Sequence, residues 1–248
     1  MLSNRQIKLI QSLKQKKFRS EHQLFIAEGE KIAAEVLNNS SYAVSAIYAT
    51  ADWIKLNSKA LENYSSLVEV SENELKKISL LSTPNKVLIL LHSAFKKPEM
   101  EAPWTIVVDT LQDPGNLGTI IRIADWFGIQ DVVLSENSVE VFNPKVIQST
   151  MGSFMRVNVS YHDLLEWLPQ QNRATYGAVL GGENLYKTKF PESGILVLGN
   201  ESKGISPELL QLIDYQIEIP KRGGAESLNV SVACSIFSNE IMRQSFQQ

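Results

Sequence analysis

Four segments in the second half of this 248-residue sequence combine glycine with side chains that can bind a small molecule. Each carries Asn, Ser, Glu or Arg beside its glycines. They span residues 109–118, 180–184, 199–204 and 220–229. One glycine-rich loop alone is explained by a tight turn, because glycine adopts backbone conformations that other residues avoid. Several such polar loops together favour a small-molecule pocket.

Two of these segments match nucleotide-binding motifs only in part. Gly199 and Gly204 have the glycine spacing of a P-loop, but Ile205 follows where the phosphate-binding lysine would stand. The turn with Gly115 and Gly118 lacks the third glycine and the closely spaced pair of a dinucleotide fingerprint. The sequence therefore argues against hydrolysis of a nucleoside triphosphate, and it gives no support for a nicotinamide cofactor.

The sequence also gives no support for a metal site or for covalent catalysis by a nucleophilic side chain. The histidines His22, His92 and His162 are scattered, so no Cys/His/Asp cluster has the spacing of metal ligands. The single cysteine, Cys234, has apolar neighbours and is interpreted as a buried packing residue. No segment resembles the Gly-x-Ser-x-Gly turn of serine hydrolases. We expect no metal site and no nucleophilic side chain.

The glycine-rich segments follow apolar runs that predict β-strands. These runs span residues 105–108, 131–134, 174–180, 195–198 and 216–219. Several are almost continuously apolar, as in parallel strands that are covered on both faces. Ligands of such sheets bind outside the carboxyl ends of the strands. The candidate loops are therefore placed where an α/β domain binds its ligand.

The first half of the chain predicts a second, smaller α/β domain. Short apolar runs at residues 24–27, 44–49, 67–70 and 87–91 alternate with helical patterns at residues 31–37 and 72–80. Residues 96–103 contain two prolines and four charges without periodicity, which is typical of a linker. We expect a domain at residues 1–95, a linker at 96–103 and a domain at 104–248.

Charge is distributed unevenly, although the net charge is only −3. Residues 1–20 contain six basic residues and no acidic one. The basic residues are Arg5, Lys8, Lys14, Lys16, Lys17 and Arg19. They are candidates for contacts with RNA phosphates, and a solvated helix face is the alternative. We expect a cytoplasmic protein with no membrane partner, because no signal peptide and no apolar stretch of about 20 residues is present.

Three segments resemble the signature motifs of the SpoU (TrmH-like) RNA methyltransferases. They are Asp-Pro-Gly-Asn-Leu-Gly-Thr-Ile-Ile-Arg-Ile-Ala at residues 113–124, Leu-Gly-Asn-Glu-Ser-Lys-Gly-Ile-Ser at 198–206 and Ile-Pro through Glu-Ser-Leu-Asn-Val-Ser-Val-Ala at 219–233. Their order and separations are similar to those of the family. Residues 7–29 also resemble the substrate-binding extension of these enzymes, which is akin to certain ribosomal proteins. The resemblance covers nearly the whole chain.

The resemblance implies a fold, a cofactor and partners. The fold is an α/β parallel-sheet domain with a trefoil knot, of the SPOUT type, behind a small α/β RNA-binding domain. The knot opposes the general rule against threaded chains. The cofactor is S-adenosylmethionine, held largely by backbone groups at Leu180, Gly181, Gly199, Ile219 and Leu228. The partners are ribosomal or transfer RNA and a second copy of the chain in a homodimer.

The implied reaction moves a methyl group from S-adenosylmethionine to a ribose 2′-hydroxyl. The resemblance assigns catalytic roles to Asn116, Arg122, Glu201, Ser227 and Asn229. A guanidinium is hardly ever deprotonated in proteins, so Arg122 suits a phosphate or a developing alkoxide better than it suits the role of a base. The acceptor of the proton stays open. An ion pair of Arg122 with Asp125 and helix capping by Ser227 or Asn229 are the structural alternatives.

Two other functions compete with this one. An RNA-binding or ribosome-associated protein with the same fold could have lost catalysis, but such a chain should also have lost some of the five candidate catalytic residues. An unrelated nucleotide-dependent enzyme should bind ATP or NAD instead of S-adenosylmethionine. The intact motif residues favour an active methyltransferase.

Overall fold

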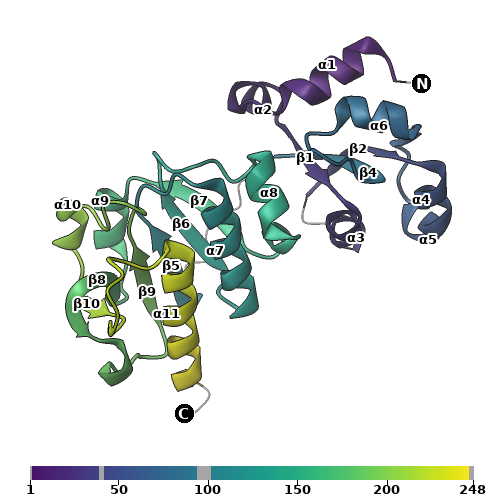
Figure 1. Cartoon of the computed structure of the whole chain (residues 1–248). Helices are drawn as coiled ribbons and strands as arrows, with labels where there is room; N and C mark the ends of the chain where they lie inside the picture. Colours follow the sequence, from purple (N-terminus) through teal and green to yellow (C-terminus); the bar gives the residue numbers. More distant parts are fainter. Residues whose placement is uncertain (1, 39–41, 94–101, 246–248) are drawn as a thin grey trace. The chain divides into compact units, whose positions relative to one another are not determined.

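The computed structural model describes residues 2–38, 42–93 and 102–245, and it contains two compact units (Figure 1). One unit contains residues 2–38, 42–93 and 140–155, and the other contains residues 102–139 and 156–245. The expected linker at residues 96–103 lies mostly outside the described residues, so the domain boundaries stay a prediction. Among the described residues, no helix is both long and apolar enough to cross a bilayer.

The first unit is built on a four-stranded sheet with the order β1-β4-β2-β3. The strands β2 and β3 are parallel, and β4 is antiparallel to both β1 and β2. The strands are β1 (Leu24–Glu28), β2 (Val44–Ala49), β3 (Leu67–Glu69) and β4 (Val87–His92). The helices are α1 (Asn4–Ser12), α2 (Lys16–His22), α3 (Glu30–Asn38), α4 (Ala51–Leu56), α5 (Ser58–Leu61), α6 (Glu72–Ile78) and α8 (Pro144–Thr150), and η1 (Ser153–Met155) is a 3-10 turn. The strands and helices expected from the sequence are confirmed.

Capping residues define where two of these helices begin. The Ser3 hydroxyl accepts a hydrogen bond from the Gln6 amide, and the Gln6 side chain accepts one from the Ser3 amide. Ser71 and Glu74 form the same reciprocal capping box at the start of α6. Helix α8 contacts β1, and the Phe25 ring of β1 packs against the Phe154 ring of η1, with the ring centroids 5.9 Å apart. The sequence had no signal for this last contact.

The second unit has a fully parallel six-stranded sheet with the order β10-β8-β9-β5-β6-β7. The strands are β5 (Trp104–Val108), β6 (Asp131–Ser135), β7 (Asn158–His162), β8 (Thr175–Asn184), β9 (Gly194–Leu198) and β10 (Tyr215–Glu218). Ile106 and Val107 point to opposite faces of β5, and both are fully buried. The sheet is therefore covered on both faces, which confirms the expected α/β class.

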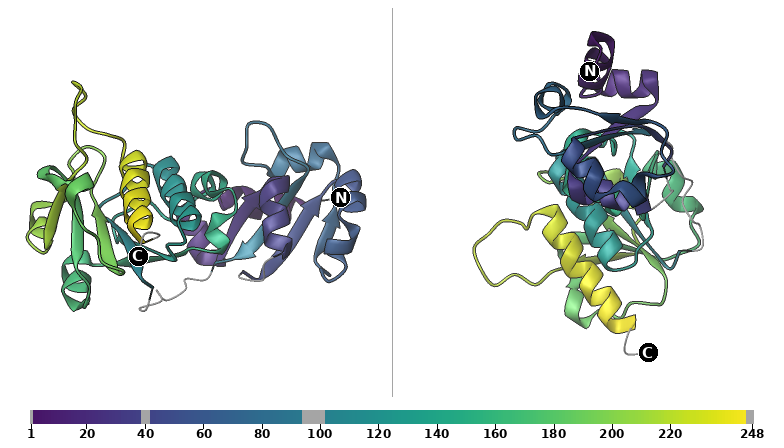
Figure 2. Two further views of the ribbon diagram at one scale, coloured as in Figure 1. Left: turned by 90° about the horizontal axis from the view of Figure 1, so that it is seen from below. Right: turned by 90° about the vertical axis from the view of Figure 1, so that its right-hand side faces the viewer.

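Two long helices lie side by side over one face of this sheet (Figures 1 and 2). They are α7 (Pro114–Trp126) and α11 (Val230–Ser245). Asp113 caps helix α7, because its carboxylate accepts a hydrogen bond from the Asn116 amide, and the helix begins at Pro114. Shorter helices, α9 (Leu164–Trp167) and α10 (Pro207–Leu210), and the 3-10 turns η2 (Leu168–Gln170) and η3 (Leu185–Lys187) complete the unit.

The pairing of β8 with β10 is interrupted by an irregularity in β8. Gln216 pairs with Gly177, but the next residue, Ile217, pairs with Glu183, so residues 178–182 bulge out of the ladder. The sequence predicts a strand to residue 180 and a loop from 180 to 184, whereas β8 continues to Asn184 and its pairing with β10 resumes at Glu183. A Cβ atom at Gly182 would lie 2.5 Å from the Gln216 carbonyl oxygen, so the returning chain needs glycine there. The implied trefoil knot stays a prediction.

Candidate functional site

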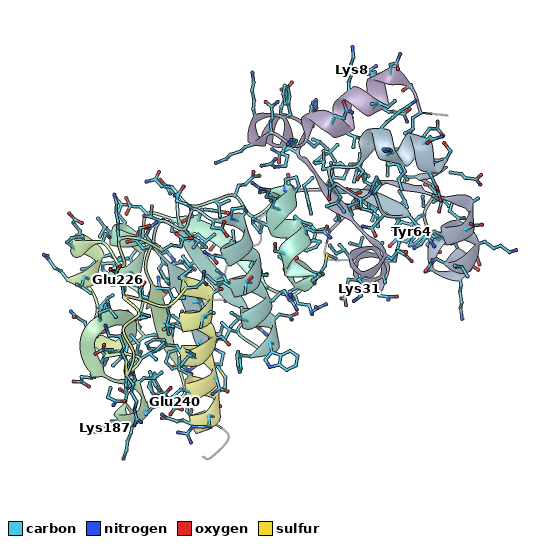
Figure 3. The ribbon with its side chains drawn as sticks, in the orientation of Figure 1. Lys8, Lys31, Tyr64, Lys187, Glu226 and Glu240 are labelled. Carbon is cyan, nitrogen blue, oxygen red and sulfur yellow. The ribbon has the colours of Figure 1, made fainter. Side chains whose placement is uncertain are left out.

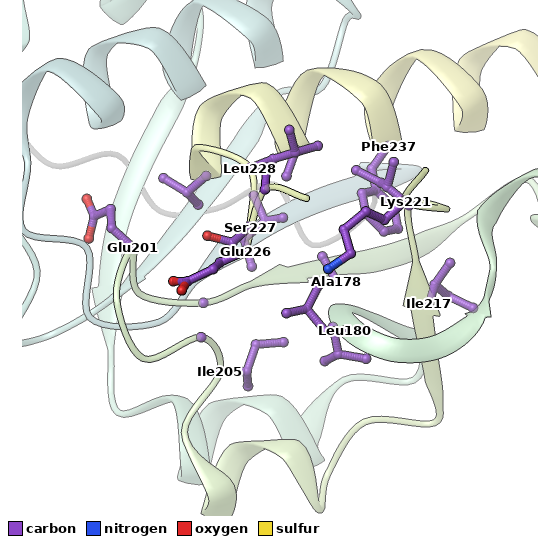
Figure 4. A pocket seen from close by; sticks show the side chains of 18 of the residues that line it. Ala178, Leu180, Glu201, Ile205, Ile217, Lys221, Glu226, Ser227, Leu228 and Phe237 are labelled. Carbon is purple, nitrogen blue, oxygen red and sulfur yellow. The ribbon is translucent and has the colours of Figure 1, made fainter. Parts of the chain in front are cut away.

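A pocket of about 630 Å³ lies at the carboxyl ends of β8, β9 and β10 (Figure 4). Three of the four glycine-rich segments contribute to its lining. The β8 bulge, the loop after β9 and the loop before α11 supply Leu180, Gly199, Glu201, Lys221, Glu226, Ser227 and Leu228. The volume is in the range of pockets that enclose small molecules. Three of the four segments therefore converge on one pocket, whereas the segment at residues 109–118 does not line it.

The loop after β9 folds back tightly on itself. The Asn200 amide donates to the Gly204 carbonyl at 2.9 Å, and the Gly204 amide donates to the Asn200 carbonyl at 3.0 Å. A Cβ atom at Gly199 would lie only 2.0 Å from the Gly204 carbonyl carbon. Glycine at position 199 is therefore required by the approach of backbone to backbone, and this approach shapes one wall of the pocket.

The pocket wall is apolar near the strands and charged at its rim. Ile217, Ile219 and Phe237 lie among the lining residues, as do the partly exposed side chains of Leu180 and Leu228. The carboxylates of Glu201 and Glu226 belong to the loops around them (Figure 4). The lining also includes the cationic residues Lys203, Lys221 and Arg222, so the pocket combines an apolar slot with a rim of mixed charge.

Asn116 joins two of the loops through its side chain. Its Nδ2 donates to Glu201 Oε1 at 3.1 Å, and the same oxygen accepts the Asp113 amide at 3.2 Å. Asn116 Oδ1 accepts a hydrogen bond from Asn229 Nδ2 at 3.0 Å. The structure thus brings three of the five candidate catalytic residues into one hydrogen-bonded network beside the pocket.

Asn229 also caps helix α11, so the structural alternative is correct as well. Its Oδ1 accepts hydrogen bonds from the amides of Ser231 at 2.9 Å and Val232 at 3.4 Å. Its Nδ2 remains directed to Asn116. Ser227 lies two residues earlier, lines the pocket and is exposed. The side-chain amide of Asn229 therefore caps helix α11 and also holds Asn116.

Arg122 is exposed on α7 and does not line the pocket. The alternative in which it pairs with Asp125 is wrong, because Asp125 accepts hydrogen bonds from Arg156 instead, from Nε at 2.9 and 3.1 Å and from Nη2 at 2.8 Å. Within the described parts of the chain, no hydrogen bond or ion pair of the Arg122 guanidinium is found. The group is therefore available to a ligand. Its catalytic role stays a prediction, as do the roles of the other four residues.

The expected cofactor residues lie largely at the pocket. Leu180, Gly199, Ile219 and Leu228 line it. Gly181 is exposed beside Leu180 in the β8 bulge, with a φ of +80°, but it is not a lining residue. Other lining residues were not among those expected, and they include Lys221, Glu226 and Phe237. The first two stood in a quoted glycine-rich segment, whereas the helical position of Phe237 carried no signal for a pocket.

The N-terminal basic residues differ in exposure. Arg5, Lys8, Lys14, Lys16 and Lys17 are exposed, and Lys8 projects from α1 (Figure 3). Arg19 is only 3% exposed, so the expectation that it contacts RNA is wrong. Its guanidinium donates to the Leu13 carbonyl at 2.8 Å and forms an ion pair with Glu140. A buried guanidinium needs such partners, and its burial keeps Arg19 away from phosphates in solvent.

Cys234 is a buried residue of α11. Burial raises the pKa of the Cys234 thiol to about 12, which keeps it protonated and unreactive. The thiol is fully buried in α11, as the sequence suggested. In the described part of the chain, no three His, Cys, Asp or Glu side chains are grouped to hold a metal ion.

Comparisons with known proteins agree with this geometry. The model of the SpoU rRNA methylase family matches residues 103–239, and that of the MRM3-like substrate-binding domain matches residues 4–89. The chain is 31% identical over 237 residues to the 23S rRNA (guanosine(2553)-2′-O)-methyltransferase of Bacillus subtilis, and the match covers 94% of each chain.

Two solved structures share the fold over almost the whole chain. A Porphyromonas gingivalis protein that is assigned to the TrmH family of RNA methyltransferases matches with a TM-score of 0.87 and 38% identity, over 98% of this chain and 99% of that one. An rRNA methyltransferase from Sinorhizobium meliloti, solved with bound AdoMet, matches with a TM-score of 0.87 and 26% identity, over 98% of this chain and 96% of that one.

Proposed function

Since this chain belongs to the SpoU rRNA methylase family, we propose that it transfers a methyl group from S-adenosylmethionine to a ribose 2′-hydroxyl of ribosomal RNA. The observation that carries the proposal is the network of Asn116, Glu201 and Asn229 beside a pocket built from three glycine-rich loops. The B. subtilis relative is named for 2′-O-methylation of 23S rRNA, which favours ribosomal over transfer RNA. An enzyme that acts on ribosomal RNA also suits the expected cytoplasmic location.

The pocket fits S-adenosylmethionine in size and in chemistry. Leu180, Ile219 and Leu228 offer an apolar slot for a planar base, and the loop around Gly199 brings backbone groups close to it. The carboxylates of Glu201 and Glu226 would favour a sulfonium charge that lies nearer to them than to Lys203, Lys221 and Arg222, which line the same pocket. When bound, this cofactor supplies an electrophilic methyl group. We propose that Gly181 contacts it through backbone atoms beside Leu180.

The residues of the chain would act mainly by position and charge. The hydrogen bond between Asn116 and Asn229 holds the first turn of α7 against the start of α11, and Asn116 also binds Glu201. This one network would therefore position both the ribose and the methyl donor. Such alignment can contribute about 7 to 11 kcal/mol to lowering a barrier. Arg122 would bind an RNA phosphate or stabilise the developing alkoxide with its fork of donors. Ser227 lies in the pocket wall, where its hydroxyl would contact the ribose.

The test is methyl transfer from radiolabelled S-adenosylmethionine to RNA from cells that lack this gene. We expect incorporation into ribosomal RNA at a ribose, no incorporation into transfer RNA and none into RNA from cells with the gene, whose site is already modified. Incorporation into transfer RNA would correct the substrate. No incorporation into either, with cofactor binding retained, would favour the inactive RNA-binding alternative.

We propose that the exposed lysines of α1 and α2 bind phosphates of the substrate. Lys8, Lys14, Lys16 and Lys17 are all exposed, and no acidic residue lies within residues 1–20. Replacing the four by glutamine should weaken RNA binding by at least about tenfold at low salt and much less at high salt, because fewer counterions are released. Filter binding across a salt series measures this. An affinity that does not change at low salt would leave these lysines a solvated face.

We propose that the protein forms a homodimer through its methyltransferase unit, with Trp126 at the interface. Trp126 ends α7 and is 84% exposed, and Val232 on the adjacent α11 is also exposed. Exposed tryptophan is favoured at the centre of interfaces. Trp126→Glu should shift the mass measured by light scattering from dimer to monomer. Leu56→Glu is the control, because Leu56 is similarly exposed in the other unit. A dimer that persists in Trp126→Glu would contradict the proposal.

A further inference from the structure

The backbone just after β5 adopts an unfavourable conformation at Thr110. Its φ is +54°, in the left-handed region that β-branched residues rarely enter. This residue begins the segment that leads to Asp113 and Asn116. Such a conformation persists only where the surroundings hold it. The contacts of Thr110 therefore show which groups fix the path of the loop.

A turn after β6 supplies two of those contacts through serine hydroxyls. The Thr110 amide donates to Ser135 Oγ at 2.7 Å, and the Leu111 amide donates to Ser138 Oγ at 3.1 Å. The two hydroxyl oxygens lie 3.0 Å apart and share a hydrogen bond. The Ser138 amide closes the turn by donating to the Ser135 carbonyl at 2.9 Å. The two serines thus bind the consecutive amides of Thr110 and Leu111. We call this strained turn of the backbone the Thr110 corner.

The loop after β9 holds the same corner from another direction. Asn200 Nδ2 donates to the Thr110 carbonyl at 2.7 Å. The Asp109 carboxylate accepts the Thr110 hydroxyl at 2.7 Å and the Ser206 amide at 2.9 Å. Both polar groups of the Thr110 backbone are therefore bound by side chains. The corner is fixed between the turn after β6 and the loop that carries Glu201.

We propose that Ser135 and Ser138 are positioning residues for methyl transfer, because they hold the Thr110 corner and so place Asn116 against Glu201. This inference rests on the proposed function. Neither serine lies in a glycine-rich segment or lines the cofactor pocket. Residues 109–116 do not line that pocket either. Loss of the serine contacts should therefore lower the rate of the chemical step without weakening the binding of S-adenosylmethionine.

The first test separates rate from binding. In Ser135→Ala we expect kcat for RNA methylation to fall by about tenfold or more, since small displacements of a reacting group have effects of this size or larger. The affinity for S-adenosylmethionine, measured by calorimetry, should stay within about twofold of the wild type. Ser135→Thr keeps the hydroxyl and should retain most of the rate. A wild-type kcat in Ser135→Ala, or a parallel loss of cofactor affinity, would overturn the proposal.

The second test uses rescue. Asparagine enters the left-handed region far more readily than threonine, so Thr110→Asn should keep the corner when a serine contact is lost. In the double variant Ser135→Ala with Thr110→Asn, we expect kcat to rise above that of Ser135→Ala. The increase in log kcat should be at least half of the decrease that Ser135→Ala causes. Thr110→Val is the control, because it also removes the hydroxyl but remains β-branched and should rescue nothing. Equal rescue by valine, or none by asparagine, would contradict the role of the corner.

Hydrogen exchange provides a measurement that needs no activity. In Ser135→Ala the amides of residues 109–117 should exchange faster, and those of residues 220–229 should exchange as in the wild type. If the amides of residues 109–117 exchanged in Ser135→Ala as they do in the wild type, the proposal would be overturned. This result does not depend on whether the protein methylates RNA. Absence of methyl transfer by the wild type itself would instead count against the proposed function, so the two failures are distinguishable.

Discussion

Arg122→Ala should reduce methyl transfer by about 10²- to 10³-fold, the loss that follows removal of one group that stabilises developing negative charge. Cofactor binding and stability should be nearly unchanged. Arg122 is exposed, lies outside the pocket lining and, within the described residues, makes no ion pair. Nothing in the fold therefore depends on its side chain. Steady-state methylation assays, calorimetry with S-adenosylmethionine and thermal unfolding measure the three quantities.

Arg156→Ala is the matched control for this experiment. It removes another partly exposed arginine of the same unit, whose ion pair with Asp125 has an Arg156 Nη2 to Asp125 Oδ2 distance of 2.8 Å. An exposed ion pair contributes about 1 kcal/mol or less, so this variant should remain active. Arg122→Lys should recover little activity, because lysine keeps the charge but lacks the planar fork of donors. Wild-type activity in Arg122→Ala would remove Arg122 from the site.

Gly199→Ala should abolish or strongly weaken the binding of S-adenosylmethionine. The added Cβ would lie 2.0 Å from the Gly204 carbonyl carbon and 2.2 Å from the Ile205 nitrogen, and both are backbone atoms of the pocket wall. Overpacking costs about 1 to 3 kcal/mol, which corresponds to at least about a fivefold loss if the loop opens to relieve it. Calorimetry with the cofactor measures the loss, and thermal unfolding shows whether the fold survives.

Gly223→Ala is the matched control in the same pocket. Gly223 lines the pocket, but a Cβ built there meets nothing within 4 Å, so this variant should bind the cofactor as the wild type does. If both variants bound equally well, the tight turn between Gly199 and Gly204 would not be needed for the site. If both lost binding, the loss could not be attributed to the backbone approach at Gly199.

Local patterns were sufficient for most of the secondary structure. The apolar runs at residues 105–108, 131–134 and 195–198 correspond to β5, β6 and β9, because a strand covered on both faces must be apolar throughout. Strand β7 was missed because polar Asn158 and Ser160 interrupt its run. The second part of β8 was missed because its pairing resumes at Glu183, beside the distant strand β10. The residues around Glu183 show no local pattern that predicts pairing with β10.

The site residues that belong to a sequence motif were predictable. The residues that join the site only through contacts with distant segments were not. Asn116, Glu201 and Asn229 stood in motif segments, and the structure joins them in one network. The direction of a side chain was harder to predict. Arg19 was one of six similar basic residues in the sequence, yet it alone is buried against Glu140. Ser135 and Ser138 carried no signal at all.

The sequence by itself therefore determined which segments form strands, where glycine turns follow them and which residue types are present for chemistry. These properties depend on a few neighbouring residues, because backbone preferences and apolar periodicity are local. Only the tertiary structure decided which side chains meet. Arg19 and Glu140 are 121 positions apart, and Asn116 and Asn229 are 113 positions apart. Partners at such separations are chosen by how the chain packs and by the cost of burying an unpaired polar group, and no local pattern contains that information.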